Sequence, residues 1–292
     1  MDGLIRDWQN YTMRYRLFRP GLALGVCLAI LPMACQASAS PSDTVPSATV
    51  GGQRLEISLA CPVMLHVRTE NGLKNTVRGH WPDNTAITHQ PDGTLRLTLE
   101  TCPPPSAEPQ APATLDITTP ADMPLAIEAP QAQGMTLDNR TGPVVVHAGA
   151  GLTQLGTAET LDLISEATGQ ITIPTLPESA RLRSTGSANI TVNKANGTAL
   201  SVYLGGASAF MAHSGKLKAL EITSASTQDA IFHGETEVAA LHVENSGSII
   251  VDKASGTLAT ERDGPGQILV NQPQGSPSGQ PGAPSGHQPA KN

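Results

Sequence analysis

Short apolar stretches recur through the second half of the chain at a nearly constant spacing. Each copy between residues 161 and 270 holds two stretches of alternating apolar and polar residues, joined by a turn of small residues. The copies are LDLISEATGQITI, ARLRSTGSANITV, LSVYLGGASAFMA, LEITSASTQDAIF, LHVENSGSIIV and ATERDGPGQILV. Repetition at a period of about 20 residues is typical of a solenoid, in which each unit buries its apolar side only against its neighbours.

Two series of apolar residues carry this common period. The first series comprises Leu163, Leu182, Val202, Ile222 and Val243. The second series comprises Ile171, Ile190, Phe210, Ile231 and Ile250. We expect both series to face inward, with the polar residues between them facing outward, because side chains alternate along a strand. The pattern predicts an all-β, parallel β-solenoid that winds right-handed.

The alternation of apolar and polar residues also predicts strands in the N-terminal part of the chain. Alternating stretches cover 55–59, 63–67 and 95–99, and Asp92-Gly93 before the last of them is a turn signal. We expect these strands to cap one end of a solenoid domain that spans residues 53–271. A Pro-rich insertion interrupts that domain at 103–113, and the weak last rung from Thr260 to Val270 is expected to shield the other end.

The two ends of the chain do not fit the repeat. Residues 272–292 are rich in Pro, Gly and Ser with almost no apolar side chains, which predicts a disordered tail. Residues 1–39 combine a basic stretch with an apolar run at 21–33 that is short for a membrane span of about 20 residues. We interpret them as an export signal, with Met13 as a possible true start, followed by a polar linker at 40–52.

Two processing routes fit this signal. Ala37-Ser38-Ala39 has the small-x-small pattern of a cleavage site that would release a soluble protein. The segment LPMAC instead resembles a lipoprotein signal, with Cys35 as the lipidated residue and Pro32 as a departure from the usual aliphatic position. Both routes place the protein in the periplasm, at the outer membrane or outside the cell.

Export leaves Cys61 and Cys102 as the two cysteines of the domain. In an oxidising compartment the simplest expectation is a disulfide between them, and the alternative is two free thiols.

The net charge of the chain after export disfavours some classes of binding partner. Cleavage after Ala39 leaves 14 Lys and Arg against 23 Asp and Glu, a net charge of 14 − 23 = −9. An acidic protein without basic clusters is a poor ligand for nucleic acid and for anionic membrane surfaces. We therefore predict no nucleic-acid partner, and contact with a membrane only through a lipid anchor at Cys35.

Several of these segments resemble a known bacterial family. LEISLACPVMLHVRTENG and HQPDGTLRLTLE are similar to the opening strands of the auto-transporter adhesin head, or head GIN, domain. STGSANITV and ENSGSIIV are similar to its recurring turn. The resemblance spans residues 51–271, and the cysteine pair and the Pro-rich insertion depart from the family pattern. It implies an exported β-solenoid of the cell envelope and carries no established catalytic residues.

One polar column could bind a metal. Asn193, His213, His233 and Asp252 follow one another at the period of the repeat, so they would occupy successive rungs about 4.8 Å apart. Imidazole and carboxylate groups are natural zinc ligands, which makes His213, His233 and Asp252 weak metal candidates. The alternative is a solvated column at the corner of the coil, and we predict no bound metal or cofactor.

Aromatic side chains are scarce, at 3% of the chain. Phe210 and Phe232 fit the apolar pattern and are expected in the core, which leaves Trp81 and Tyr203 as candidate binding residues. No pair of carboxylates is placed by the sequence as glycoside hydrolysis requires, and none of the common catalytic motifs occurs. We assign no catalytic residue.

These observations favour a non-enzymatic envelope β-solenoid with a structural or adhesive role. Its flat polar faces would bind a protein or glycan partner. Two alternatives stay open: a polysaccharide-active lyase or hydrolase that uses the polar column, and an envelope assembly or stress module that captures a protein at an open end.

Overall fold

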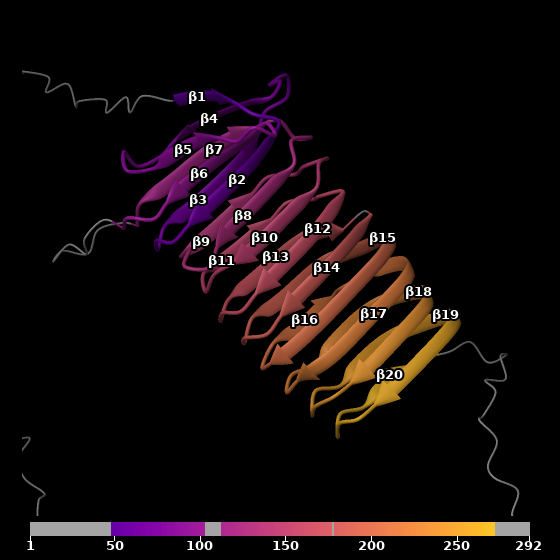
Figure 1. Ribbon diagram of the computed structural model, residues 1–292. Coiled ribbons are helices and arrows are strands. Elements are labelled where there is room, and N and C mark those ends of the chain that lie inside the picture. Colours follow the sequence, from indigo (N-terminus) through magenta and orange to yellow (C-terminus); the bar gives the residue numbers. More distant parts are fainter. Residues whose placement is uncertain (1–47, 103–111, 177, 272–292) are drawn as a thin grey trace, which may run out of the picture. The chain divides into compact units, whose positions relative to one another are not determined.

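The computed structural model describes residues 48–102, 112–176 and 178–271 (Figure 1). The predicted export signal with Met13 and Cys35, most of the linker, most of the Pro-rich insertion and the C-terminal tail lie outside these residues. Within the described part the regular structure is entirely β, and no helix there is long and apolar enough to cross a membrane.

Twenty strands make up the described part. Their bounds are β1 (Ala48–Gly51), β2 (Arg54–Leu59), β3 (Met64–Thr69), β4 (Thr76–His80), β5 (Ala86–His89), β6 (Thr94–Leu99), β7 (Thr114–Thr119), β8 (Leu125–Ala129), β9 (Gly134–Leu137), β10 (Val144–Ala148), β11 (Leu152–Leu155), β12 (Thr160–Ser165), β13 (Gln170–Leu176), β14 (Ser179–Ser184), β15 (Asn189–Gly206), β16 (Ala209–Ala212), β17 (Gly215–Ser226), β18 (Ala230–Val243), β19 (Ile249–Arg262) and β20 (Ile268–Val270).

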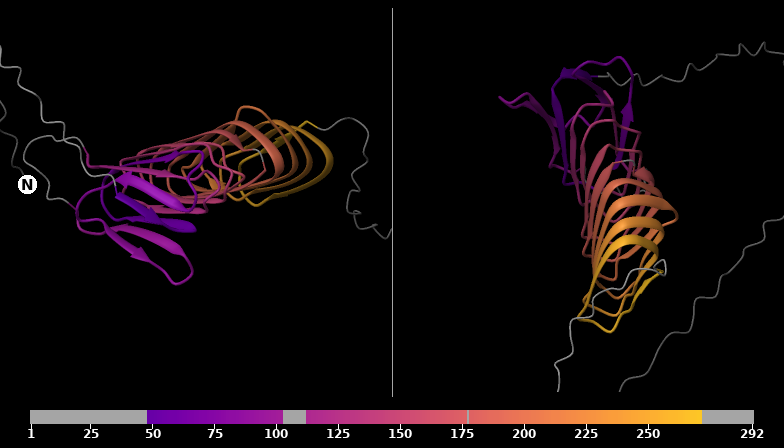
Figure 2. Two further views of the ribbon diagram at one scale, coloured as in Figure 1. Left: turned by 90° about the horizontal axis from the view of Figure 1, so that it is seen from above. Right: turned by 90° about the vertical axis from the view of Figure 1, so that its right-hand side faces the viewer.

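The strands stack into two parallel rows that are the long faces of a solenoid (Figures 1 and 2). Face 1 runs in the order β6, β2, β8, β10, β12, β14, the second half of β15, β17 and the second halves of β18 and β19. Face 2 runs in the order β7, β3, β9, β11, β13, the first half of β15, β16, the first parts of β18 and β19, and β20. This confirms the predicted parallel β-solenoid, and its right-handed sense stays a prediction.

Alternate side chains of each strand fill the interior. β12 and β14 bury every second residue, and their inward rows continue through β15 and β17. On face 2, Phe210 lies opposite Ala230 and Ala212 lies opposite Phe232, all of them almost completely buried. Large and small side chains therefore alternate between neighbouring rungs and keep a thin core close-packed. The prediction that both phenylalanines belong to the core is confirmed.

The second predicted inward series is wrong at its C-terminal end. Ile190 and Phe210 are in register with Ala230 and then Ile249, so Ile231 and Ile250 face outward and are only half-buried. The reason is packing, because the small Ala230 fits beside the large Phe210 in the interior, whereas the sequence pattern favoured the larger isoleucine.

A smaller correction applies to face 1. The register partner of Ile222 is Leu241 rather than Val243, although Val243 is itself buried further along the strand. The rung that ends in β18 is one residue shorter than the rung before it. The residue that pairs with Ile222 therefore lies earlier in the chain than Val243.

The first rungs are stacked out of sequence order. β2 and β3 pair on one side with β6 and β7, and on the other side with β8 and β9. The rung of β2 and β3 comes first in the chain, and the rung of β6 and β7 stacks on one side of it. The connection from β7 to β8 then passes back across the first rung, and β8 and β9 stack on its other side. Residues 120–124 form this crossing.

A buried arginine fixes the crossing. Arg140 is 3% exposed, and its guanidinium donates to the Thr119 hydroxyl at 2.7 Å and to the carbonyls of Pro120 and Met123 at 2.9 and 2.7 Å. Burial lowers the pKa of Arg140 to about 10, and the nearby Asp122 and Asp138 carboxylates oppose that change. A forked cation that satisfies several carbonyls at once can hold a loop that has no strand partners of its own.

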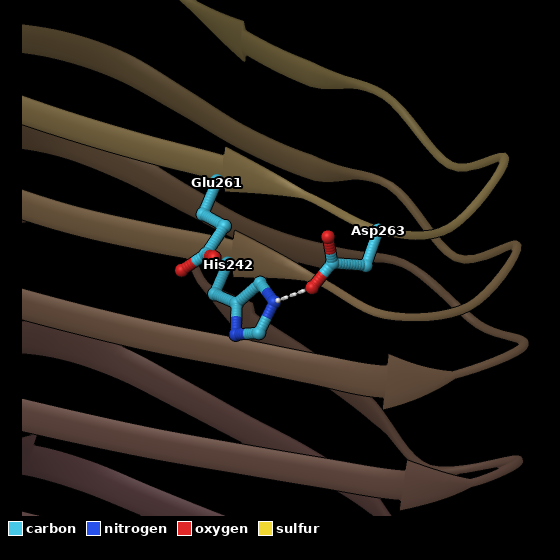
Figure 3. A group of neighbouring side chains, drawn as sticks. All are labelled: His242, Glu261 and Asp263. Carbon is cyan, nitrogen blue, oxygen red and sulfur yellow. Dashed lines mark hydrogen bonds and ion pairs between the residues drawn. The ribbon is translucent and has the colours of Figure 1, made fainter.

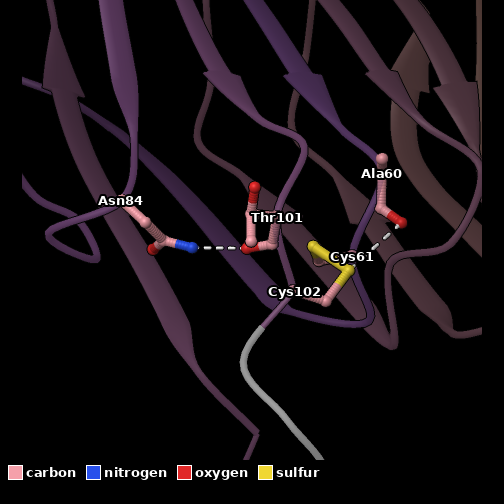
Figure 4. The surroundings of a disulfide bond; sticks show 5 residues. All are labelled: Ala60, Cys61, Asn84, Thr101 and Cys102. Atoms are coloured by element: carbon pink, nitrogen blue, oxygen red, sulfur yellow. Dashed lines mark hydrogen bonds between the residues drawn. A yellow bond between two sulfur atoms is a disulfide. The ribbon is translucent and has the colours of Figure 1, made fainter.

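The predicted Cys61–Cys102 disulfide is present (Figure 4). Cys61 follows β2 and is fully buried, while Cys102 lies after β6 on the neighbouring rung. The bond closes a separation of 41 residues and joins the two rungs that the chain stacks out of order. On the chain-entropy account such a loop contributes about 4 kcal/mol.

N-terminal strands cover this end of the solenoid, but they are β1, β4 and β5 rather than the stretches predicted to cap it. The stretches at 55–59, 63–67 and 95–99 are β2, β3 and β6, which belong to the parallel rungs. β5 pairs antiparallel with β6 at the edge of face 1, and β4 pairs antiparallel with β7 at the edge of face 2. β1 then pairs antiparallel with β4, so the described strands begin at Ala48, inside the segment assigned to the linker. At the other end β19 and β20 form the last rung, and no described strand pairs with its outer side.

Substituting aspartate at an inward position tests the rung assignment. Ile222 is 0% exposed, so Ile222→Asp buries an unpaired carboxylate and should lower the free energy of unfolding by more than about 3 kcal/mol. Thr223→Asp, one residue along and facing outward, should change it by less than about 1 kcal/mol. Urea unfolding followed by circular dichroism measures both, and equal stability of the two variants would contradict the assignment.

Removing the Arg140 side chain tests its role at the crossing. Arg140→Ala leaves two carbonyls and a hydroxyl without their donor and should destabilise the protein by about 3 kcal/mol. Arg54→Ala is the control, because Arg54 lies on β2 at the same end and its side chain is 51% exposed. Differential scanning calorimetry gives the comparison, and a loss no greater than that of the control would show that the crossing is held by other contacts.

Candidate functional site

The outer surface of face 1 carries an unbroken column of side chains. Parallel register places Arg96, Glu56, Ala126, Val145, Asp162, Arg181, Ser201, Glu221, Ala240 and Ala259 next to one another in that order. These residues alternate with the inward residues of the same strands, so they point out of the coil. We call this set column 1.

Column 1 lines a long, shallow groove. A hollow of about 500 Å³ follows it from Val145 on β10 to Ala240 on β18. A second hollow of about 340 Å³ continues it toward the N-terminal end and shares Val145 with the first. Small residues at Ala126, Ser201 and Ala240 leave this space open, and Val145 is 41% exposed within it.

Stretches of charged and polar residues are separated by apolar positions along the groove. Arg96 donates to the Glu56 carboxylate at 2.7 Å, and Ser201 donates to the Glu221 carboxylate at 3.1 Å. Asp162 and Arg181 lie side by side between these pairs. The groove therefore offers side-chain hydrogen-bond donors and acceptors on two stretches, at Arg96 and Glu56 and from Asp162 to Glu221, with the apolar Ala126 and Val145 between them.

A second column, column 2, runs beside the first. Its members in order are Thr98, Ser58, Glu128, His147, Ile164, Arg183, Tyr203, Thr223, His242 and Glu261. The guanidinium of Arg183 lies 5.2 Å from the centre of the Tyr203 ring, within the range of a cation–π contact. This contact holds the ring in place at the middle of column 2.

Column 2 ends in a cluster of ionisable groups (Figure 3). His242 Nε2 is 3.0 Å from Asp263 Oδ2, and His242 Nδ1 is 3.4 Å from Glu244 Oε1. The hydrogen bond with Asp263 raises the pKa of His242, and the charges of Glu261 and Glu244 add to this effect. His242, Glu261 and Asp263 each offer an atom within 4.8 Å of the others.

The two predicted binding residues lie far apart in the stack. Tyr203 is part of column 2 on face 1. Trp81 follows β4 at the covered N-terminal end, where it is half-buried against the core and lies over Gly79. The structure therefore does not bring them into one site, and their role in binding stays a prediction.

The predicted polar column directly follows one paired row at the corner of face 2. Asn193, His213, His233 and Asp252 each follow a residue of one paired row, Val192, Ala212, Phe232 and Val251. His233 Nδ1 is 3.1 Å from Asp252 Oδ1, with both side chains about half exposed at 47% and 49%. In the part of the chain that the structure describes, the group that could share one ion is instead the His242 cluster.

Arg183 and His242 were not among the site residues predicted from the sequence. Each lies next to a member of the first apolar series, and each precedes its column neighbour, Tyr203 or Glu261, by one period of the repeat. The same period that predicted the corner column would have found them, had it been applied to the outward positions of face 1.

Comparisons with known proteins agree with the fold. No protein-family model and no curated protein sequence matches this chain. A solved structure of a "putative adhesin" from Parabacteroides distasonis is 16% identical, with a TM-score of 0.56, over 77% of this chain and 96% of that one. A "putative adhesin" from Bacteroides fragilis is 17% identical, with a TM-score of 0.45, over 79% and 99%. A "putative lipid binding protein" from Parabacteroides distasonis is 14% identical, with a TM-score of 0.40, over 77% and 96%.

The first of these similarities shows that the chain shares its fold with nearly the whole length of that protein. The shared fold agrees with the β-solenoid that the resemblance to the adhesin-head domain implies.

Proposed function

We propose that the protein is an exported, non-catalytic adhesive module of the bacterial envelope that binds an extended partner along face 1. The observation that carries the proposal is the continuous groove beside column 1, which several successive rungs line with alternating charges, small residues and hydroxyls. A groove of this length suits a chain-like ligand, either a polysaccharide or an extended protein segment, because it runs continuously over several successive rungs.

The arrangement of the groups supports binding rather than turnover. The carboxylates along the groove contact neighbours that are typical of a solvated surface, such as Arg96 for Glu56 and Ser201 for Glu221. The fold shared with a "putative adhesin" supports the same role, and the export signal predicted at residues 1–39 supports a place in the periplasm, at the outer membrane or outside the cell.

The energy of such binding would come from a few residues near the middle of the face. Arg181 and Glu221 are charged donors and acceptors, and Tyr203 is an aromatic surface held by Arg183. Arginine and tyrosine are enriched among the residues that dominate binding energy at interfaces. Polysaccharide hydroxyls and peptide groups could both use these side chains.

A binding and turnover assay tests the proposal. The exported chain is incubated with neutral and acidic polysaccharides and with envelope proteins of the producing bacterium, and retention is measured together with release of reducing or unsaturated sugar ends. Retention of one ligand without products is the expected result. Release of products would overturn the non-catalytic role.

Charge reversal in the groove then locates the binding surface. Arg181→Glu should weaken retention of the ligand at least tenfold, about 1.4 kcal/mol, and Tyr203→Ala should do the same. The matched control is Lys194→Glu, which makes the same change of charge at an exposed position of face 2. Equal affinity of Arg181→Glu and Lys194→Glu would show that face 1 is not the binding surface.

A further inference from the structure

We propose that His242, Glu261 and Asp263 form a binding site for one divalent transition-metal cation, with Zn²⁺ as the best match. The site lies at the end of column 2, on the last two rungs of face 1 (Figure 3). It is separate from the polar column at the corner of face 2, and it is independent of the ligand proposed for the groove.

The distances between the three groups are close to those of a metal site. Their ligand atoms lie within 4.8 Å of one another, and His242 Nε2 is 3.0 Å from Asp263 Oδ2. Zinc bonds of about 2.0–2.2 Å in a tetrahedron place neighbouring ligand atoms about 3.4 Å apart. Glu261 and Asp263 are exposed, so their side chains have the freedom to rotate toward this spacing.

The backbone fixes where the ligands start. His242 on β18 and Glu261 on β19 are register partners, and the amide of Asp263 donates to the Val243 carbonyl at 2.8 Å. Ligands that stand on paired strands need little ordering when an ion binds, because their backbone positions are already set.

Glu244 supplies a partner for the second imidazole nitrogen. Its Oε1 lies 3.4 Å from His242 Nδ1, whereas Asp263 lies beside the other ring nitrogen, Nε2. With the proton of a neutral imidazole on Nδ1 and directed at Glu244, the Nε2 lone pair is free for a metal. A carboxylate in this position orients metal-ligating histidines in many zinc sites.

The balance of charge at this end of face 1 also favours a cation. Within the described residues, His242 is the only basic side chain that forms an ion pair with Glu244 or Asp263, and Glu261 forms none. By contrast, His233 at the corner column pairs with a single carboxylate, that of Asp252. Three carboxylates around one imidazole leave an excess of negative charge that a divalent ion would neutralise.

The donor set selects the kind of ion. One imidazole and two carboxylates suit Zn²⁺ and its neighbours, and a fourth position stays open to water. Ca²⁺ requires about six to eight oxygen ligands, more than this cluster offers.

Titration calorimetry of the exported chain, purified without a histidine tag and kept at a mildly alkaline pH, tests the site with Zn²⁺, Ca²⁺ and Mg²⁺ as separate probes. We expect one Zn²⁺ per chain, and no comparable binding of the other two. His242→Ala and Asp263→Asn should each weaken this binding at least tenfold, and Glu244→Gln should weaken it about tenfold through the lost orienting contact.

The matched controls are His233→Ala and Asp252→Asn, which remove the same two kinds of side chain from the same two rungs. They should leave Zn²⁺ affinity unchanged, and thermal unfolding of every variant verifies that it is folded. No Zn²⁺ binding, binding unaffected by folded His242→Ala and Asp263→Asn, or binding lost in the His233 and Asp252 variants instead would overturn the proposal.

Discussion

The parallel hydrogen-bonded register between successive rungs is the constraint on which the rest of the structure depends. It turns one period of the sequence repeat into neighbours about 4.8 Å apart in space. Inward rows then bury apolar side chains one above another, and outward rows become columns. The groove of face 1, the stacked Arg183 and Tyr203, and the His242 cluster all follow from that register. The chemistry of these three features differs because outward side chains can vary between rungs without disturbing the packing of the core, whereas inward side chains cannot.

The N-terminal end shows what the register alone does not determine. Any rung there can pair on either side, and the chain places β6 and β7 outside β2 and β3 before it returns. That order requires a crossing without strand partners, which the buried Arg140 holds through three acceptors. The disulfide joins the same two rungs. Antiparallel β4 and β5 then cover the edges, so that this end does not offer free strands to other chains.

Much of the fold could be predicted from the sequence, because a repeat reveals which residues stack. The inward positions of Ile190 and Phe210 and the pairing of the two cysteines could all be predicted from the repeat and the composition. The strands that cover the N-terminal end, β1, β4 and β5, could not, because they lack the clear alternation of the rung strands. The prediction failed at Ile231 and Ile250, because the small Ala230 takes the inward place beside Phe210 and shifts the series by one residue. The stacking order of the first rungs could not be predicted, since local patterns contain no information on which side of a rung the next one adds.

The candidate site was predicted less completely than the fold. The metal candidates at His213 and His233 share a column, but spacing alone does not say which side chains meet. His242 gathers carboxylates from its own strand end and from the next rung, and that arrangement is visible only in three dimensions.

The central claim is that ten strands present one continuous, in-register outer face. The most direct measurement is pulsed electron–electron double resonance on residues 40–292 of the protein with nitroxide labels at Ala126→Cys and Ala240→Cys. The two positions lie six rung steps apart in column 1. The account predicts a narrow distribution of distances centred at about 29 Å, from six steps of about 4.8 Å. A broad distribution, or a narrow one centred more than about two rungs away from that value, would contradict it.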